Sequence, residues 1–211
     1  ENKVAVVTGA TGALGRVVAK MLLEKGARVV VPYRTEDRLA ELHSFVGHLK
    51  NNLVGVKGDV TDGQSVRNLV QKAVEKHGRV DILLNIVGAY AGGTDIANTD
   101  ESLWDYMMNG NLKSAFLCSK AVLPHMIKQD YGKIVSVSSL IAVDKRRRAK
   151  SGAYAVSKAG VIVLTETIAE EVKDYDINVN CVMPSIIDTR SNRRNFTKAD
   201  FSTWVDPKDI A

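Results

Sequence analysis

Near its N-terminus the chain contains Val4-Ala5-Val6-Val7-Thr8-Gly9-Ala10-Thr11-Gly12-Ala13-Leu14-Gly15, a β-branched run that leads into three evenly spaced glycines. Apolar residues then recur with helical spacing over residues 16–23, so a strand is expected to pass through a tight turn into a helix. At such a turn the helix presents free N–H groups and the positive end of its dipole, and both attract a phosphate. The usual dinucleotide fingerprint spaces its glycines differently, so the turn by itself fits a phosphate site and a purely structural turn equally well.

The segment after this turn completes a β-α-β unit. Gly26 is expected to end the helix, and residues 27–31 predict a second strand, which together have the size of one mononucleotide-binding half. Folds of this kind that bind NAD carry an acidic residue beyond the second strand, where it holds the ribose hydroxyls. This chain has Arg34 there, and a cation suits a ribose 2′-phosphate. The sequence therefore favours NADP over NAD, with Glu36 and Asp37 keeping NAD as the alternative.

Strands and helices alternate through the rest of the chain. Four more strands are predicted from apolar runs, at residues 53–58, 81–88, 134–139 and 177–184. Helical patterns separate them, at residues 36–45, 65–76, 99–128 and 153–172. Strands that are apolar on both faces and alternate with helices indicate a parallel sheet covered on both sides. We therefore predict one α/β domain over residues 1–211, a three-layer, Rossmann-like, doubly wound parallel sheet.

Composition limits the class of protein. The chain has 211 residues, two cysteines and a net charge of +5 at pH 7. It has no apolar run long enough for a bilayer and no signal-peptide pattern, and two isolated thiols suit a reducing compartment, so we expect a cytoplasmic protein with no membrane partner. Much of the positive charge lies at residues 145–150 and at Arg190, Arg193 and Arg194. Zinc-ligand spacing and interleaved aromatic residues do not accompany this charge, so we predict no metal site and no nucleic-acid partner.

Two residues of the last predicted helix suggest proton chemistry. Tyr154 and Lys158 are four residues apart and share a helix face. A lysine ammonium near a phenol favours the phenolate, so we expect the pKa of Tyr154 to be lowered toward neutrality. Such a tyrosine can exchange a proton with an alcohol or a carbonyl. Ser139, with Ser138 as its rival, can donate a hydrogen bond to the same oxygen.

Asn111 follows Gly110 in the middle of the long helix predicted over residues 99–128. Glycine costs about 1 kcal/mol relative to alanine in a helix interior, and such a weak point usually has a packing or functional reason. Here Asn111 can hold a water molecule that joins the lysine to solvent.

These motifs together resemble those of the short-chain dehydrogenase/reductase family, in its smaller single-domain form, across nearly the whole chain. The matching segments are residues 8–15, 59–60, 85–88, 111–112, 138–139 and 184–189, with Tyr154 and Lys158. The resemblance implies that Asn111, Ser139, Tyr154 and Lys158 are catalytic, with Tyr154 as the acid/base. It also implies contacts to the cofactor from a larger set: Gly9, Thr11, Gly12, Ala13, Leu14, Gly15, Arg34, Asp59, Val60, Asn85, Val87, Gly88, Tyr154, Lys158, Pro184, Ile187 and Thr189.

The chain departs from the family pattern at several positions. Ala13 and Ser185 stand where glycine is usual, and Ile86 and Val87 replace a more common Asn-Ala pair. The family normally continues into a last strand, so six strands rather than seven are expected and the chain resembles a C-terminally incomplete member. The resemblance also implies a homotetramer or homodimer built on the helices that contain Asn111 and Tyr154.

These observations predict an NADP-dependent oxidoreductase that transfers a hydride between nicotinamide and a carbonyl or secondary alcohol. The basic residues 145–150 suggest an anionic or carrier-bound substrate, such as the 3-oxoacyl group of acyl carrier protein that reductases of this family accept. The alternative is a non-catalytic NADP-binding sensor or interaction protein with the same fold. A complete set of Asn, Ser, Tyr and Lys argues against that alternative, because a sensor has no need of Tyr154.

Overall fold

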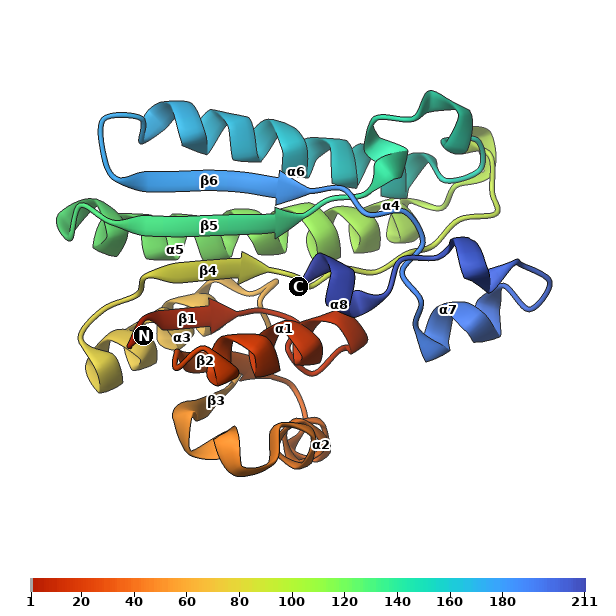
Figure 1. The fold of residues 1–211 in the computed structure, drawn as a ribbon. Helices are drawn as coiled ribbons and strands as arrows, with labels where there is room; N and C mark the ends of the chain where they lie inside the picture. The colour runs from red at the N-terminus through yellow and green to blue at the C-terminus, as the bar shows by residue number, and fades with distance from the viewer. Residues whose placement is uncertain (1) are drawn as a thin grey trace.

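The computed structural model describes residues 2–211 and shows a six-stranded parallel sheet with helices on its faces (Figure 1). The strands are β1 Val4–Val7, β2 Arg28–Tyr33, β3 Leu53–Lys57, β4 Ile82–Asn85, β5 Gly132–Val137 and β6 Ile177–Val182. Their order in the sheet is β3-β2-β1-β4-β5-β6. The chain thus winds outward from β1 to one edge and from β4 to the other, which places a topological switch point between β1 and β4. The predicted α/β fold and its six strands are confirmed.

Alternate residues of the central strands pack into two separate cores. The helices are α1 Ala13–Glu24, α2 Glu36–Val46, α3 Gly63–His77, α4 Glu101–Met107, α5 Ser114–Lys128, α6 Gly152–Glu171, α7 Arg190–Asn195 and α8 Pro207–Ile210. Val6 and Val30 face α3, α5 and α6, whereas Val7 and Val31 face α1 and α2. Because successive side chains of a strand point to opposite faces, strands buried on both faces need apolar residues at every position. None of the helices within residues 2–211 combines the length and the apolar character needed to cross a membrane.

At the carboxyl ends of the strands the chain leaves the sheet earlier than the apolar runs predict. The strand predicted to residue 88 ends at Asn85. The hydroxyl oxygen of Thr8, which follows β1, accepts hydrogen bonds from Ile86 N at 3.0 Å and Val87 N at 3.3 Å. A side chain therefore takes the place of the next rung of the β1–β4 ladder, and the chain from Ile86 onward turns over the end of the sheet.

The helix predicted over residues 99–128 is not one α-helix. α4 and α5 are joined by a π-helical segment, Met108–Lys113, and α5 continues through Pro124 to Lys128. A π-helical turn accommodates an extra residue and is frequent at functional sites. The weak point that the sequence shows at Gly110-Asn111 lies inside this segment.

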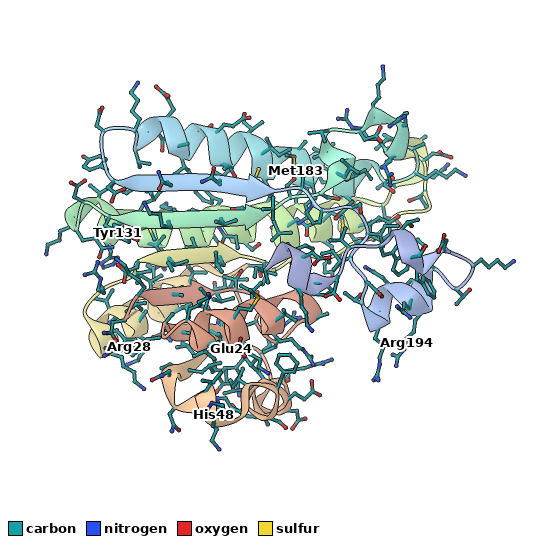
Figure 2. All side chains as sticks on the ribbon, viewed as in Figure 1. Glu24, Arg28, His48, Tyr131, Met183 and Arg194 are labelled. Carbon is teal, nitrogen blue, oxygen red and sulfur yellow. The ribbon has the colours of Figure 1, made fainter. Side chains whose placement is uncertain are left out.

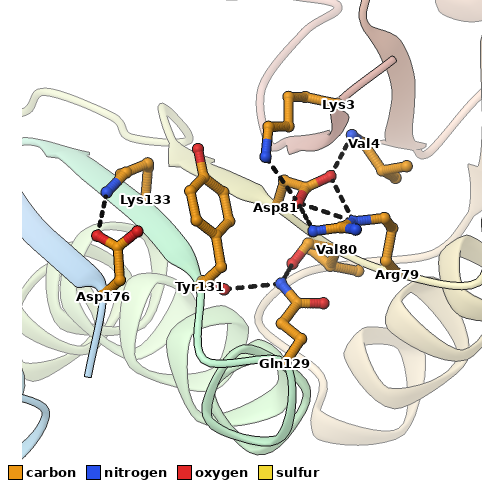
Figure 3. A network of polar contacts seen from close by, with 9 residues as sticks. All are labelled: Lys3, Val4, Arg79, Val80, Asp81, Gln129, Tyr131, Lys133 and Asp176. Atoms are coloured by element: carbon orange, nitrogen blue, oxygen red, sulfur yellow. Dashed lines mark hydrogen bonds and ion pairs between the residues drawn. The ribbon is translucent and has the colours of Figure 1, made fainter. Parts of the chain in front are cut away.

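The amino ends of the strands are joined by a polar network around Asp81 (Figure 3). The Asp81 carboxylate, which is completely buried, accepts a hydrogen bond from Val4 N at 2.9 Å and forms ion pairs with Arg79 and Lys3. Gln129 Nε2 donates to the carbonyl oxygens of Val80 and Tyr131, both at 2.7 Å. These contacts hold together the amino ends of β1, β4 and β5. The carboxyl ends of the strands are free of this network.

Figure 2 marks the two ends of the sheet by two labelled side chains, Tyr131 just before β5 and Met183 just after β6. At the side of the sheet, the outer edge of β6 pairs with no strand among residues 2–211. Its residues alternate between buried and exposed at the start of the strand, with Ile177 and Val179 inside and Asn178 and Asn180 outside.

Candidate active site

The turn between β1 and α1 is built on glycine for two different reasons. Gly9 has a φ of +69°, which other residues rarely adopt. Gly15 lies where a Cβ would collide with the carbonyl group of Gly9, so only glycine lets the helix start this close to the strand. Gly12 precedes α1 and donates its N–H to Gly9 O at 2.8 Å, and Ala13 is exposed at the first position of the helix. The start of this 12-residue helix therefore faces solvent at the switch point of the sheet, where parallel α/β folds bind their ligands.

Two of the predicted cofactor-binding residues, Arg34 and Asp59, meet after the ends of β2 and β3. Asp59 Oδ1 accepts hydrogen bonds from Thr61 N at 2.9 Å and from Thr61 Oγ1 at 2.8 Å. The backbone bond from Thr61 is the main cause that lowers the pKa of Asp59, and the charge of Arg34 lowers it further. Arg34 is exposed, whereas Glu36 accepts a hydrogen bond from Tyr33 and pairs with Lys57. Arg34, which favours NADP, and Glu36, which would favour NAD, therefore both lie just after the end of β2.

Asn111 and Lys158 converge on Gly88, from the π-helical segment and from α6. A Cβ on Gly88 would lie 2.9 Å from Asn111 Oδ1 and 3.1 Å from Lys158 Nζ. Asn111 is 1% exposed, and its Oδ1 accepts a hydrogen bond from Ala89 N at 2.8 Å while its Nδ2 donates to Ser157 Oγ at 3.0 Å. The π-helical turn therefore directs an amide at the loop after β4, and only a glycine at position 88 leaves room for both side chains.

Lys158 is 4% exposed, and burial lowers its pKa to about 8. Its Nζ donates a hydrogen bond to Val137 O, the last residue of β5, at 2.8 Å. Ser138 Oγ donates to Lys158 O at 2.8 Å and is buried. Ser138 therefore anchors α6 to the sheet, which leaves Ser139, partly exposed at the next position, as the serine that is available to a substrate.

The expected lowering of the pKa of Tyr154 is wrong for this structure. Burial raises the pKa of the phenol, and its hydrogen bond with the side chain of Ser139 offsets this only in part. The ammonium group of Lys158 lies 6.0 Å from the centre of the Tyr154 ring and donates its hydrogen bond to Val137 O. Desolvation of the phenolate thus outweighs any benefit from the lysine, as is general for an acid buried without a close counter-charge. The side chain of Ser139 is thus close enough to Tyr154 to affect the pKa of the phenol.

Not all the predicted residues join this group. Asn85 is buried in the core, where its Nδ2 donates to Ser119 Oγ and Ser136 Oγ at 3.2 Å each, so its amide holds β4 to α5 and β5. Val60 and Val87 pack against the core on the α3 and α5 side. In the glycine turn, Thr11 is partly exposed and Leu14 is buried. The side chains of Asn85, Val60, Val87 and Leu14 therefore take part in packing.

The segment after β6 lies at the same carboxyl ends of the strands. Pro184 O accepts a hydrogen bond from Leu140 N at 3.0 Å, next to Ser139. Ile187 pairs with Val205 as an isolated bridge, which closes the base of the loop that carries α7. Thr189 Oγ1 accepts a hydrogen bond from Asn192 N at 3.1 Å and caps α7. β6 ends at Val182, so Pro184, predicted as the last residue of that strand, lies just after it. The Thr189 hydroxyl keeps its hydrogen free to donate.

Sequence analysis missed an aromatic cluster beside Tyr154. The ring of Tyr90, in the loop after β4, meets the ring of Tyr154 edge-on, with centroids 5.0 Å apart and planes at 87°. The ring centroid of Phe196 lies 6.3 Å from that of Tyr90 and 6.2 Å from that of Trp204, so the cluster continues into the loop that carries α7. Tyr90, Phe196 and Trp204 lie outside the strands and the helices, in segments without periodic patterning, so the sequence carries no signal that brings them together.

The comparisons with known sequences agree with this geometry. The pattern of the short chain dehydrogenase family matches residues 3–200. The chain is 34% identical over 212 residues to an uncharacterised oxidoreductase of Staphylococcus saprophyticus. The aligned region covers 100% of this chain and 88% of that protein. It is also 34% identical over 189 residues to the 3-oxoacyl-[acyl-carrier-protein] reductase FabG of Thermotoga maritima, which covers 90% of this chain and 76% of that reductase.

Solved structures extend the likeness to the whole fold. A variant of actinorhodin polyketide ketoreductase, crystallised with NADPH, superimposes with a TM-score of 0.90 at 27% identity and covers 99% of this chain and 87% of that one. The structure of ElxO with NADP bound gives a TM-score of 0.92 at 26% identity and covers 100% of this chain and 88% of that one. With its glycine turn, its switch point and its Tyr-Lys pair at the carboxyl end of a parallel sheet, the chain belongs to the short-chain dehydrogenase/reductase family of oxidoreductases.

Proposed function

We propose that the protein is an NADPH-dependent carbonyl reductase in which Asn111, Ser139, Tyr154 and Lys158 are catalytic. The observation that carries the proposal is the convergence of Asn111 Oδ1 and Lys158 Nζ on Gly88, with a Cβ there at most 3.1 Å from either atom. Burying a lysine without a carboxylate partner costs free energy, and such costs are typical of functional sites. A protein that only senses the cofactor would have no need of the proton donor Tyr154 on the same helix as Lys158.

The chain fits the cofactor along the end of the sheet. The open start of α1 and the glycines before it suit the pyrophosphate. Arg34 suits a ribose 2′-phosphate, because it is exposed beside Asp59, while Glu36, the carboxylate that would favour NAD, is engaged by Tyr33 and Lys57. The solved structures of the two relatives that contain NADPH or NADP support the same preference. When bound, NADPH supplies the hydride.

The protein residues then manage the proton. Since burial raises the pKa of Tyr154, the phenol is protonated at neutral pH, which is the state required of the acid in a reduction. Ser139 donates a hydrogen bond to the same substrate oxygen and stabilises the charge that develops there. Lys158 and Asn111 meet next to Gly88, and we assign to this pair the passage of a proton between solvent and Tyr154.

NADPH oxidation with a panel of ketones tests this proposal. Replacing Tyr154 by Phe removes the proton donor and keeps the ring, so kcat is expected to fall by about 100- to 10,000-fold, the contribution usual for a general acid. Binding of NADPH, followed by its fluorescence, is expected to persist in Tyr154→Phe. Equal turnover by the wild type and this variant would contradict the assignment.

A second measurement tests the cofactor preference. Replacing Arg34 by Gln removes a charged hydrogen bond worth about 1.5–3 kcal/mol, so the KM for NADPH should rise by about 10- to 100-fold. The KM for NADH should change little, because NADH has no 2′-phosphate. A parallel rise for both cofactors would show that Arg34 does not read the 2′-phosphate.

The substrate class follows from the relatives and from the loop after Ser139. The reductase FabG, named for 3-oxoacyl-[acyl-carrier-protein], supports a 3-oxoacyl substrate on an anionic carrier. Asp144 pairs with both Arg146 and Arg147, and the hydrogen bond from Arg146 lowers the pKa of that carboxyl to about 2. Arg148 instead donates to the backbone carbonyls of Ile141 and Ala142, so it is structural. Lys145 is exposed and forms no ion pair within residues 2–211, so it is the best candidate for contact with a carrier, and Lys145→Gln should raise the KM for carrier-bound substrates but not for small neutral ketones.

The proposed protein is cytoplasmic and assembles as a homodimer or homotetramer through the helices that hold Asn111 and Tyr154. Cys118 and Cys181 are unpaired thiols, which suits a reducing compartment. Large apolar side chains are exposed on α4, α5 and α6, among them Trp104, Phe116 and Val163. Such residues gather at protein interfaces. Sedimentation equilibrium would show the assembly, and a monomer at all concentrations would contradict it.

A further inference from the structure

Tyr90 is an unusual residue for the place it occupies. It lies in the loop after β4, and its side chain is 51% exposed, so it is not there to fill the core. Its ring nevertheless meets Tyr154 edge-on at 5.0 Å and 87°. Edge-to-face pairs have a preferred geometry and contribute about 0.5–1.5 kcal/mol beyond buried area. A contact of this kind restricts how the partner ring can turn about its own bonds.

A buried serine holds the other end of Tyr90. The hydroxyl groups of Tyr90 and Ser151 lie 3.3 Å apart. Ser151 immediately precedes α6, where serine commonly caps a helix, but its side chain makes no such cap, and its hydrogen-bond partner among residues 2–211 is Tyr90. Ser151 is 7% exposed. The hydroxyl that could stabilise the start of α6 is thus directed at the phenol of Tyr90.

The backbone around this pair fixes the distance between the two loops. Gly93 N donates a hydrogen bond to Lys150 O at 2.7 Å. A Cβ on Gly92 would lie 2.7 Å from both Ser151 Oγ and the Tyr90 hydroxyl, so glycine is required for the loop to pack here. Tyr154 itself lies in the first turn of α6, three residues after Ser151. The loop after β4 and the start of α6 are therefore one packed unit with the two rings at its centre.

We propose that Tyr90 is a positioning residue that, held by Ser151, fixes the ring of Tyr154 so that its hydroxyl stays beside Ser139. This inference rests on the proposed function, since it assigns a role in the same proton transfer. Tyr90 also contacts Phe196 at 6.3 Å, so it links the loop that carries α7 to the reacting residue. Burial is the main cause that raises the pKa of Tyr154, so loss of the Tyr90 ring that packs against it is expected to lower that pKa.

The kinetic test compares Tyr90→Leu with Tyr90→Phe. In Tyr90→Leu the edge contact is lost, and kcat should fall by about 10- to 100-fold, the scale of a misplaced reacting group, with the KM for NADPH unchanged. The alkaline limb of the kcat–pH profile should move to lower pH. Tyr90→Phe keeps the ring and should recover most of kcat. Wild-type kcat and pH profile in Tyr90→Leu, or a change confined to the KM for the ketone, would overturn the proposal.

Three further variants separate positioning from general damage. Tyr175→Leu removes a comparably exposed tyrosine in the turn before β6, at the far end of the sheet, and should leave kcat and the pH profile unchanged. Ser151→Ala and Tyr90→Phe each remove the same hydroxyl contact, so the double variant should lose no more kcat than either single one. Independent, multiplying losses would overturn the role given to Ser151. This pair also serves if Tyr90→Leu does not fold.

A readout without turnover distinguishes failure of this inference from failure of the proposed function. Tyrosine labelled with ¹³C at Cζ reports the ionisation of each phenol by NMR, and the Tyr154 signal is the one that Tyr154→Phe removes. The midpoint of the Tyr154 titration should be lower in Tyr90→Leu than in the wild type. An unchanged midpoint would overturn the proposal. A lower midpoint in a protein that reduces no ketone would support the contact and refute only the carbonyl reductase assignment.

Discussion

At the scale of the residue, Gly88 is the position on which the candidate site depends most. Its alanine variant places a methyl group 2.9 Å from Asn111 Oδ1 and 3.1 Å from Lys158 Nζ, and neither buried side chain can move away without losing a hydrogen bond. We expect kcat of Gly88→Ala to fall by about 10- to 100-fold while NADPH still binds. Gly63→Ala is the matched control, because a Cβ there meets only ordinary contacts, the nearest at 3.5 Å.

The buried lysine also predicts how stability depends on pH. The pKa of Lys158 is about 8 in the folded chain and 10.5 in the reference state, so between these values the unfolded chain binds the extra proton. The cost of burying the charge is fully present below pH 8 and is relieved as pH rises to about 10.5, by up to about 3 kcal/mol. In urea unfolding, the stability of the wild type relative to Lys158→Met should therefore increase with pH across this window. A constant difference would contradict the buried, unpaired state of the lysine.

The residue scale is also where the sequence was least sufficient. The spacing of Tyr154 and Lys158 correctly placed both on α6, but the sign of the Tyr154 pKa shift depends on how deeply the ring is buried, which no local pattern contains. Asn85 lies in a motif that resembles cofactor contacts, yet its amide bonds to Ser119 and Ser136 in the core. Tyr90 has no motif, because its importance comes from a contact with a helix 64 positions later.

At the scale of the element, apolar periodicity was enough to predict the strands and helices, because each strand needs apolar side chains on two faces and each long helix on one. It could not predict where β4 ends, since the Thr8 hydroxyl replaces the ladder beyond Asn85. It also could not show the π-helical form of Met108–Lys113. Gly110-Asn111 marked that segment as exceptional, and the physical reason is the direction in which Asn111 has to point.

The amino ends of β1 and β4 depend on Asp81 in a way that can be measured. In Asp81→Asn the acceptor for Val4 N remains, but the charged bonds from Arg79 are lost inside the protein, which should cost about 1.5–3 kcal/mol of unfolding free energy. Turnover should be retained, because the network lies at the amino ends of the strands and the candidate site lies at their carboxyl ends. As a matched control, Glu75→Gln breaks an exposed ion pair with Lys72 and should leave the urea midpoint unchanged.

At the scale of the whole molecule, the fold separates stability from chemistry. The network around Asp81 fixes one end of the sheet, and the glycine turn, Gly88 and the start of α6 lie at the other. Because the chain leaves β1 for α1 on one face of the sheet and leaves β4 for α5 on the other, a crevice for a ligand is expected between the two connections. Substitutions at the amino ends should therefore change the midpoint of unfolding, and those at the carboxyl ends should change kinetics.

The unpaired side of β6 has a consequence for handling the protein. Its outer edge carries backbone N–H and C=O groups that no strand within residues 2–211 takes up, and the strand Ile-Asn-Val-Asn-Cys-Val contains no charged residue. Uncharged open edges recruit strands of other molecules and seed aggregation. Solutions of this 211-residue chain should become turbid as concentration and temperature rise, and placing a lysine at the exposed position of Asn180 should delay that turbidity without changing kcat. Light scattering during a temperature ramp would measure the onset of aggregation, which should come later in the Asn180 variant than in the wild type.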